Sequence, residues 1–159
     1  MRRFLEIVSL AALAFLLAET VRALYGPAPL TGPIPTHFNA AGNPNAWGSA
    51  SMLWLLPAIS AILYLLMTWV SRHPAAFNFP VRVTPLNRQR LQAIALGMIA
   101  WLKAELVSFF ALIQWTLIRA ARKPRPTISA LSMPLLLGIV FLTIGLHFAA
   151  IFRAGRSRS

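Results

Sequence analysis

The residues best suited to chemistry lie in a polar, turn-rich segment, residues 33–49, between two long apolar segments. The candidate ligand-binding residues of this segment are His37, Phe38, Asn39, Gly42, Asn45 and Trp47. In an extended chain, alternation puts the side chains of His37 and Asn39 on one face and Phe38 on the other. Gly42 suits a turn that requires a positive φ. This combination is typical of a folded loop that recognises an extracellular peptide or a lipid headgroup.

A structural role for the same residues is the second interpretation. Phe38 and Trp47 would pack the loop onto the ends of the neighbouring helices, and Trp47 would lie at the headgroup level that indoles prefer. His37 and the asparagines would satisfy backbone groups of the loop, with residues 43–45 forming a second turn. No metal site is expected, because a single histidine without a nearby carboxylate supplies too few ligands.

A second set of candidates consists of ionisable residues within or beside apolar segments, namely Glu6, Glu19, Lys103, Glu105 and His147. Such groups are costly inside a membrane and are functional candidates for that reason. On a helix, Lys103 and Glu105 would point about 160° away from one another, so they cannot neutralise each other. Each needs another partner, and Glu6 and Glu19 are the candidates for Lys103. The pair marks a solvated interfacial helix, a buried polar contact between helices, or a proton or substrate pathway.

The remaining carboxylates have local expectations. Glu6 lies near the start of the first apolar segment, where its side chain can reach the interface or meet Arg2 and Arg3. Glu19 and Arg22 are three residues apart, so we expect a local ion pair between them.

The fourth apolar segment holds a histidine among small residues. His147 follows Gly138 and Gly145, which permit close approach of a second helix. We therefore expect His147 to form an interhelical hydrogen bond rather than to ligate a metal.

Composition indicates a membrane protein. The chain has 159 residues, is 58% hydrophobic and 11% charged, and has a mean hydropathy of +0.67. Soluble domains have about 25% charged residues. The net charge of +12 comes from short basic runs beside apolar segments, which anionic lipid headgroups explain, so nucleic acid is not an expected partner. The absence of cysteine excludes disulfides, thiol catalysis and cysteine-ligated metals.

Four apolar segments are long enough to cross a membrane, which takes about 20 residues. They are Phe4–Leu24, Ala50–Val70, Leu91–Ile118 and Leu131–Phe152. The sequence therefore predicts an all-α, polytopic transmembrane helix bundle of about four helices in a single membrane domain, residues 1–159, of which residues 91–152 supply the last two helices. The second helix is expected to start after an N-cap at Ser49 or Ser51 and to kink at Pro57. An alternative is that the first helix is a cleaved signal peptide.

The distribution of Lys and Arg predicts both termini in the cytoplasm. With the N-terminus inside, nine basic residues lie inside and five outside, and the loop 25–49 has none. The inside set is Arg2, Arg3, Arg72, Arg82, Arg88, Arg90, Arg153, Arg156 and Arg158. The outside set is Arg22, Arg119, Arg122, Lys123 and Arg125. Because the third loop is basic, a re-entrant third segment with three crossings is the alternative.

The loop sequence resembles a known family. The run from Ile34 to Gly48, Ile-Pro-Thr-His-Phe-Asn-x-x-Gly-x-Pro-Asn-x-Trp-Gly, is similar to a loop of the DUF1648 family of bacterial integral membrane proteins, which also forms the N-terminal part of SdpI-like toxin-immunity proteins. Residues 77–84, 101–106 and 114–115 resemble the family as well. The resemblance implies that residues 4–72 form a helix-loop-helix with an extracytoplasmic loop, 25–49. The family more often has Asp at the position of Asn45, and a second SdpI domain is not evident.

Signatures of enzymes are missing from the sequence. It contains no H-E-x-x-H, no G-x-S-x-G, no phosphate-binding glycine loop and no Asp. We therefore expect a protein without enzymatic activity or cofactor, which senses or binds an extracytoplasmic ligand or peptide toxin and contacts membrane lipids. One alternative is a small transporter or proton-coupled component that uses Lys103 and Glu105. Another is a structural scaffold that forms a homo-oligomer.

Overall fold

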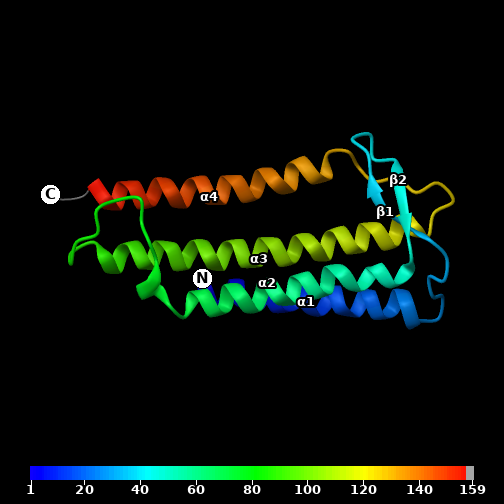
Figure 1. The fold of residues 1–159 in the computed structure, drawn as a ribbon, viewed down its shortest axis with the longest axis horizontal. Coiled ribbons are helices and arrows are strands. Elements are labelled where there is room, and N and C mark those ends of the chain that lie inside the picture. The colour runs from blue at the N-terminus through cyan, green and yellow to red at the C-terminus, as the bar shows by residue number, and fades with distance from the viewer. Residues whose placement is uncertain (157–159) are drawn as a thin grey trace.

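The computed structural model describes residues 1–156, which form four long helices and one small hairpin (Figure 1). The helices are α1 (Arg2–Tyr25), α2 (Leu55–Ser71), α3 (Arg88–Ala121) and α4 (Ser132–Arg156). The hairpin consists of β1 (Ile34–Phe38) and β2 (Pro44–Gly48), and two short 3-10 turns are η1 (Ala50–Trp54) and η2 (Pro74–Ala76). The all-α prediction is confirmed, although the hairpin inside the first loop was not predicted.

The four helices run alternately up and down, and α3 is the central one. It packs against α1 and α2 on one side and against α4 on the other (Figure 1). All four are long and apolar enough to cross a membrane, which confirms four predicted spans. The third segment is one uninterrupted helix of 34 residues, about 50 Å long at about 1.5 Å per residue. It shows no break of the kind that a re-entrant segment needs.

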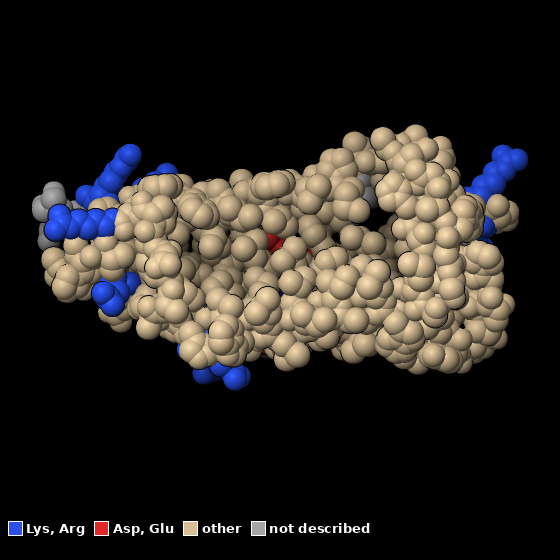
Figure 2. Space-filling model, in the orientation of Figure 1, with Lys and Arg blue, Asp and Glu red and all other residues tan. Residues whose placement is uncertain are grey.

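Charged side chains lie at the two ends of this bundle. Figure 2 shows Lys and Arg toward both ends, and between them a surface made almost entirely of other residues, with a small patch of acidic atoms visible near the centre. One end holds the N-terminus, the loop between α2 and α3, and the last turn of α4; the other, which we call the hairpin end, holds β1, β2 and the loop after α3 (Figure 1). Arg158, counted with the inside set, lies outside the described residues. Large apolar side chains are exposed along the helices, as expected for surfaces that face lipid.

The second apolar segment begins differently from the prediction. Ser49 is the N-cap, and its hydroxyl oxygen accepts a hydrogen bond from the Ser51 amide (3.3 Å), but the turn that follows is the 3-10 turn η1. The α-helix α2 starts only at Leu55, so Pro57 is its third residue. The predicted kink at Pro57 was therefore wrong, because a proline in the first turn of a helix does not interrupt a bond between two helical turns.

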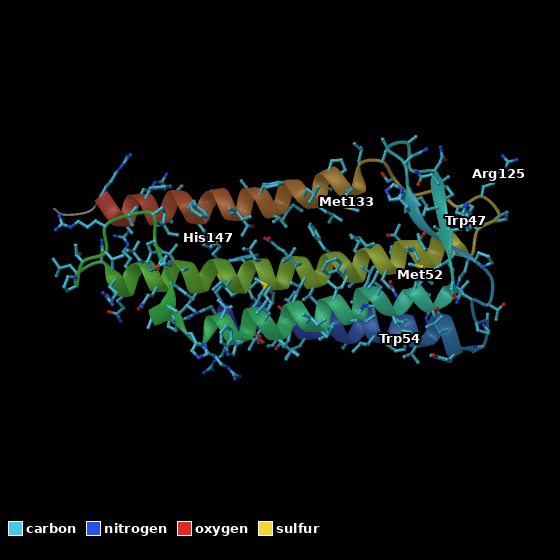
Figure 3. All side chains as sticks on the ribbon, in the orientation of Figure 1. Trp47, Met52, Trp54, Arg125, Met133 and His147 are labelled. Carbon is cyan, nitrogen blue, oxygen red and sulfur yellow. The ribbon has the colours of Figure 1, made fainter. Side chains whose placement is uncertain are left out.

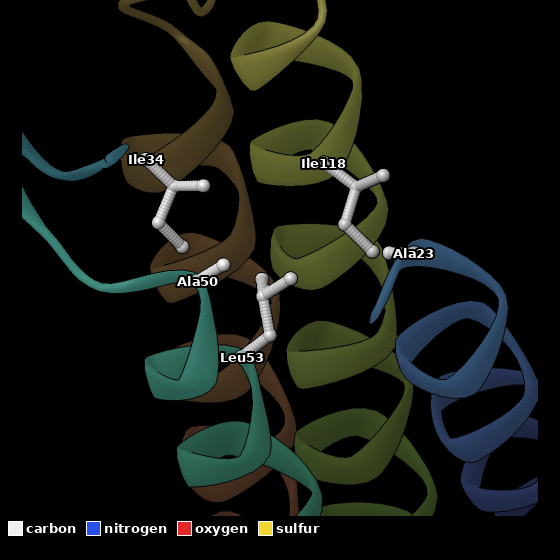
Figure 4. Packing of buried hydrophobic residues seen from close by; sticks show 5 residues of the cluster. All are labelled: Ala23, Ile34, Ala50, Leu53 and Ile118. Atoms are coloured by element: carbon white, nitrogen blue, oxygen red, sulfur yellow. The ribbon is translucent and has the colours of Figure 1, made fainter. Parts of the chain in front are cut away.

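A small apolar core fixes the hairpin to the helices. Its buried side chains come from four elements, as Figure 4 shows: Ala23, Ile34, Ala50, Leu53 and Ile118. Because Ile34 is the first residue of β1, burial of its side chain against α1, η1 and α3 sets where the hairpin leaves the membrane-spanning part of the chain.

Candidate functional site

The hairpin is organised by its turn. The amide oxygen of Asn39 accepts hydrogen bonds from the backbone amides of Ala41 and Asn43, each 3.0 Å long. Gly42 has φ +78° and donates from its amide to the Asn39 carbonyl (2.9 Å). Residues 39–43 therefore form the single turn, and Pro44 and Asn45 belong to β2. The prediction of a second turn at residues 43–45 was wrong, because Pro44 starts the strand, where its missing N–H is tolerated.

Across the two strands, the side chain of His37 meets that of Asn45. The distance between His37 Nδ1 and Asn45 Oδ1 is 2.5 Å. A neutral imidazole protonated at Nδ1 donates to this amide oxygen, which leaves Nε2 as a free acceptor. His37 is thus held by Asn45, while Asn39 holds the turn. The contacts of Asn39 are those of the structural interpretation, whereas His37 keeps one nitrogen for a ligand.

A groove lies beneath the hairpin, with a volume of about 710 Å³. Its walls come from the hairpin, the second half of α3, residues 128–130 and the start of α4. Figure 2 shows the surface hollowed between the hairpin and the start of α4. The lining includes Thr36, His37, Phe38, Asn39, Gly42, Leu112, Trp115, Thr116, Ser129, Met133 and Leu136. We call this space the hairpin groove.

Four of the six candidate residues of the loop line the hairpin groove: His37, Phe38, Asn39 and Gly42. Asn45 is connected to it through His37. Trp47 is 53% exposed, is not part of the lining, and lies on β2 at the end of the molecule (Figure 3). A position of Trp47 at the headgroup level, which indoles prefer, stays a prediction.

Half of the groove was missed by sequence reasoning. The side chains from α3 and α4, such as Leu112, Trp115 and Met133, lie in membrane-spanning segments where apolar residues occur on all sides of the helix. Such segments give no contrast between lipid-facing and groove-facing residues. A usable signal was the pair Trp115 and Arg119, four residues apart, in which the guanidinium lies 4.2 Å from the centre of the indole.

Gly42 closes one end of the groove by pairing with the loop before α4. Its carbonyl accepts a hydrogen bond from the Ile128 amide (3.0 Å), and a Cβ at Gly42 would collide with the Ile128 carbonyl oxygen. The contact needs a residue without a side chain, because the two backbones touch and because φ is positive.

We expect Gly42→Ala to destabilise the folded protein by about 1–2 kcal/mol, the cost of a left-handed alanine, plus the cost of displacing residue 128. The matched control is Gly32→Ala in the same loop, since a Cβ at Gly32 has nothing within 4 Å. Thermal unfolding in detergent micelles would measure both. Equal midpoints for the two variants would show that the contact between Gly42 and Ile128 does not form.

Lys103 is at the centre of a second polar group. Its ammonium donates to Glu6 Oε2 (2.5 Å) and to Thr68 Oγ1 (3.0 Å), and lies 4.7 Å from the centre of the Tyr64 ring. The Tyr64 hydroxyl donates to the other oxygen of Glu6. We call these four residues the Lys103 cluster. Glu6 is therefore the partner of Lys103, one of the two considered from the sequence.

Of the contacts predicted for Glu19 and Glu6, the first is present and the second differs from the prediction. Glu19 pairs with Arg22, as expected, at 2.6 Å. The hydrogen bonds recorded for Glu6 join it to α2 and α3 rather than to Arg2 or Arg3. The reason is depth, because Glu6 lies a full turn inside α1, level with Lys103.

Glu105 faces α4. Its Oε1 accepts a hydrogen bond from the Thr143 hydroxyl (2.5 Å), whereas Oε2 is buried without a partner. Figure 3 shows His147 on the side of α4 that faces α3. Its Nδ1 donates to the Thr143 carbonyl of its own helix (2.8 Å). The recorded bond is thus not the predicted interhelical one, because one turn of α4 separates donor and acceptor.

The two glycines of α4 do not act as predicted within the chain. A Cβ at Gly138 or Gly145 would have nothing within 4 Å. Gly97 of α3 faces α4, since a Cβ there would lie 3.7 Å from His147 Nε2, an ordinary contact distance. A role of Gly138 and Gly145 in a homo-oligomer stays a prediction.

Comparison with known proteins gives one match. Residues 23–61 match a family described as a domain of unknown function (DUF1648). The range runs from the end of α1 through the hairpin into α2, so it confirms the resemblance that the loop sequence indicated. Residues 77–84 and 101–106 lie outside it. No curated protein and no solved structure matched the chain.

Proposed function

We propose that this chain is a non-enzymatic, multi-pass protein of the bacterial cytoplasmic membrane that binds an extracytoplasmic ligand at the hairpin groove. The ligand has an apolar part that enters the groove and a polar part that meets His37 and Asn39. The observation that carries this proposal is that one face of the hairpin covers a cavity of about 710 Å³. Ligand sites are commonly about 300–1,000 Å³, mostly apolar, with a few polar groups that fix orientation.

Two further features support a binding role. The hairpin is fixed at its base by burial of Ile34 and at its tip by the bond between Gly42 and Ile128, so its groove face is held before any ligand arrives. A preorganised face loses less conformational entropy on binding. The distribution of basic residues supports the extracytoplasmic side, because the loop 25–49 carries no Lys or Arg.

Transport, the second function considered from the sequence, has less support. Lys103 contacts side chains of α1 and α2, whereas Glu105 contacts α4 on the other side of α3. A pathway that used both residues would have to pass through α3 or between copies of the chain. The geometry of the Lys103 cluster instead resembles a contact that holds three helices together.

Single cysteines in this cysteine-free chain test the orientation. We expect a membrane-impermeant thiol reagent to label Ala41→Cys and Thr127→Cys in intact cells, and Ala75→Cys only after lysis; all three positions are exposed. The opposite pattern would place the hairpin in the cytoplasm and overturn the extracytoplasmic assignment.

The same chemistry tests whether the groove is occupied. Ser129 lines the groove and is exposed, and Thr127, two residues away, is exposed but not part of the lining. A ligand that fills the groove in native membranes should slow labelling of Ser129→Cys several-fold relative to Thr127→Cys. Purification and reconstitution in pure phosphatidylcholine should remove the difference. Equal rates in native membranes would contradict a bound ligand.

A further inference from the structure

The hairpin groove is walled partly by helices that are long and apolar enough to cross a membrane. Its walls from α3, residues 112–117, and from α4, residues 133–136, belong to membrane-spanning segments. The polar lining residues are Thr36, His37 and Asn39 of the hairpin, Ser129 of the loop before α4, and Thr116 of α3. The Thr116 hydroxyl is already bonded to the Leu112 carbonyl of its own helix (2.8 Å). A molecule that enters sideways between α3 and α4 therefore meets apolar walls first and polar groups only at the hairpin end.

Positive charge surrounds this end of the groove. Five cations lie there, Arg22, Arg119, Arg122, Lys123 and Arg125, against one carboxylate, Glu19, so the local net charge is five minus one, or +4. Glu19 is already engaged by Arg22 at 2.6 Å. The field at the hairpin end thus favours an anion.

Arg119 is connected to the groove through a residue of its lining. Its guanidinium lies 4.2 Å from the centre of the Trp115 ring, and Trp115 lines the groove. The other two carboxylates of the described residues are engaged elsewhere, Glu6 by Lys103 and Glu105 by Thr143. The cation–π contact holds the guanidinium beside the rim without neutralising its charge.

We propose that the occupant of the hairpin groove is an anionic phospholipid of the surrounding bilayer, with an acyl chain between α3 and α4 and its phosphate at Arg119. This inference rests on the proposed function, because it specifies the ligand of the same groove. An acyl chain has no hydrogen-bonding groups to satisfy in the apolar walls. A peptide in an extended conformation, including a toxin peptide, would leave backbone amides unpaired there, at a cost of several kcal/mol for each amide.

The test uses Ser129→Cys protein in vesicles of phosphatidylcholine, with or without phosphatidylglycerol, and the labelling rate relative to Thr127→Cys as the readout. We expect phosphatidylglycerol to protect position 129, and to protect it less at high salt, because the phosphate contact is partly solvated. Phosphatidylglycerol should also appear as an adduct in native mass spectrometry. Inorganic phosphate alone should not protect, and protection by phosphate alone would overturn the lipid assignment.

A pair of charge variants makes the assignment specific. Arg119→Gln should weaken protection by phosphatidylglycerol about five-fold, the factor that corresponds to about 1 kcal/mol for one basic residue near an anionic surface. The matched control is Arg125→Gln, which removes the same charge from a side chain that extends away from the groove (Figure 3). Equal effects of the two variants would show a diffuse field and overturn the site at Arg119.

The outcomes separate this inference from the proposed function. Protection in native membranes that phosphatidylglycerol fails to restore would leave the groove as a ligand site and reject the anionic lipid. Protection restored by an apolar peptide but not by lipid would reject the lipid in favour of the peptide. Absence of protection in native membranes would reject both.

Discussion

Glu6→Gln is expected to destabilise the folded protein more than Lys103→Met, although each variant removes the same ion pair. The two charges differ in their access to solvent. The side chain of Lys103 is 5% exposed and that of Glu6 is 39% exposed. A cavity of about 170 Å³, lined by both residues and by Arg2, lies beside Glu6. Loss of Glu6 therefore leaves a buried charge on Lys103, whereas loss of Lys103 leaves a partly exposed charge on Glu6.

Losing its partner costs more free energy for the buried ammonium of Lys103 than for the carboxylate of Glu6. Glu6→Gln leaves Lys103 with the hydroxyl of Thr68 and no carboxylate, so we expect a loss of about 3–5 kcal/mol, as for other broken buried pairs. Lys103→Met leaves Glu6 bonded to Tyr64 and partly exposed, so we expect a loss of about 1–2 kcal/mol. Removing both charges together should cost less than Glu6→Gln alone.

Reversible unfolding in mixed micelles, followed by circular dichroism, measures these differences. The matched control is Glu19→Gln, which removes the ion pair with Arg22; the side chain of Arg22 is 59% exposed and that of Glu19 is 14% exposed. Exposed pairs contribute about 0–1 kcal/mol, so this control should change stability little. If Lys103→Met cost as much as Glu6→Gln, the asymmetry in burial would not govern the cluster.

The Lys103 cluster also shows what helical geometry alone could predict. The angle between Lys103 and Glu105 indicated that the two do not pair and that each needs another partner, on a facing helix, in a phospholipid or in water. Because the chain has only three carboxylate side chains, this left Glu6 and Glu19 for Lys103. The choice of Glu6 over Glu19 depends on how far α1 is shifted along α3. That shift is set by packing along the whole interface, for which an apolar sequence carries little pattern.

The hairpin also shows that local structure could be predicted from the sequence, whereas contacts between distant segments could not. The residues that make its turn, Asn39 and Gly42, were recognisable because their backbone needs are local. The groove was not, because Leu112 and Met133 come from segments far apart in the chain. The prediction of a kink at Pro57 was wrong because the sequence does not show that the 3-10 turn η1 comes first and that α2 starts only at Leu55.

Pro57 has a different consequence, which involves Gln114. In a continuous α-helix the Leu53 carbonyl would accept from the amide of residue 57, and proline has no N–H. Gln114 of α3 supplies the donor instead, since its Nε2 lies 2.8 Å from the Leu53 oxygen and 2.8 Å from Thr20 Oγ1. Gln114 is 1% exposed. One amide group thus joins α1, η1 and α3.

Gln114→Met is expected to destabilise the protein by about 2 kcal/mol, because it keeps the volume of the side chain but leaves a buried carbonyl without this donor. Gln92→Met is the matched control. Its Nε2 makes one bond, 3.1 Å long, to the Pro74 carbonyl from a half-buried position. This control should lose about 0.5–1 kcal/mol.

The proline gives a sharper test of the mechanism. In the Gln114→Met background, Pro57→Ala supplies an N–H that can reach Leu53 once the first turn of α2 relaxes, so it should restore about 1 kcal/mol. In the wild-type background the carbonyl is already satisfied, and the same change should bring no gain. The two substitutions should therefore be non-additive by about 1 kcal/mol in a double-mutant cycle. Additive effects would mean that Gln114 stabilises the bundle through Thr20 and packing alone, and that the carbonyl freed by Pro57 finds its partner elsewhere.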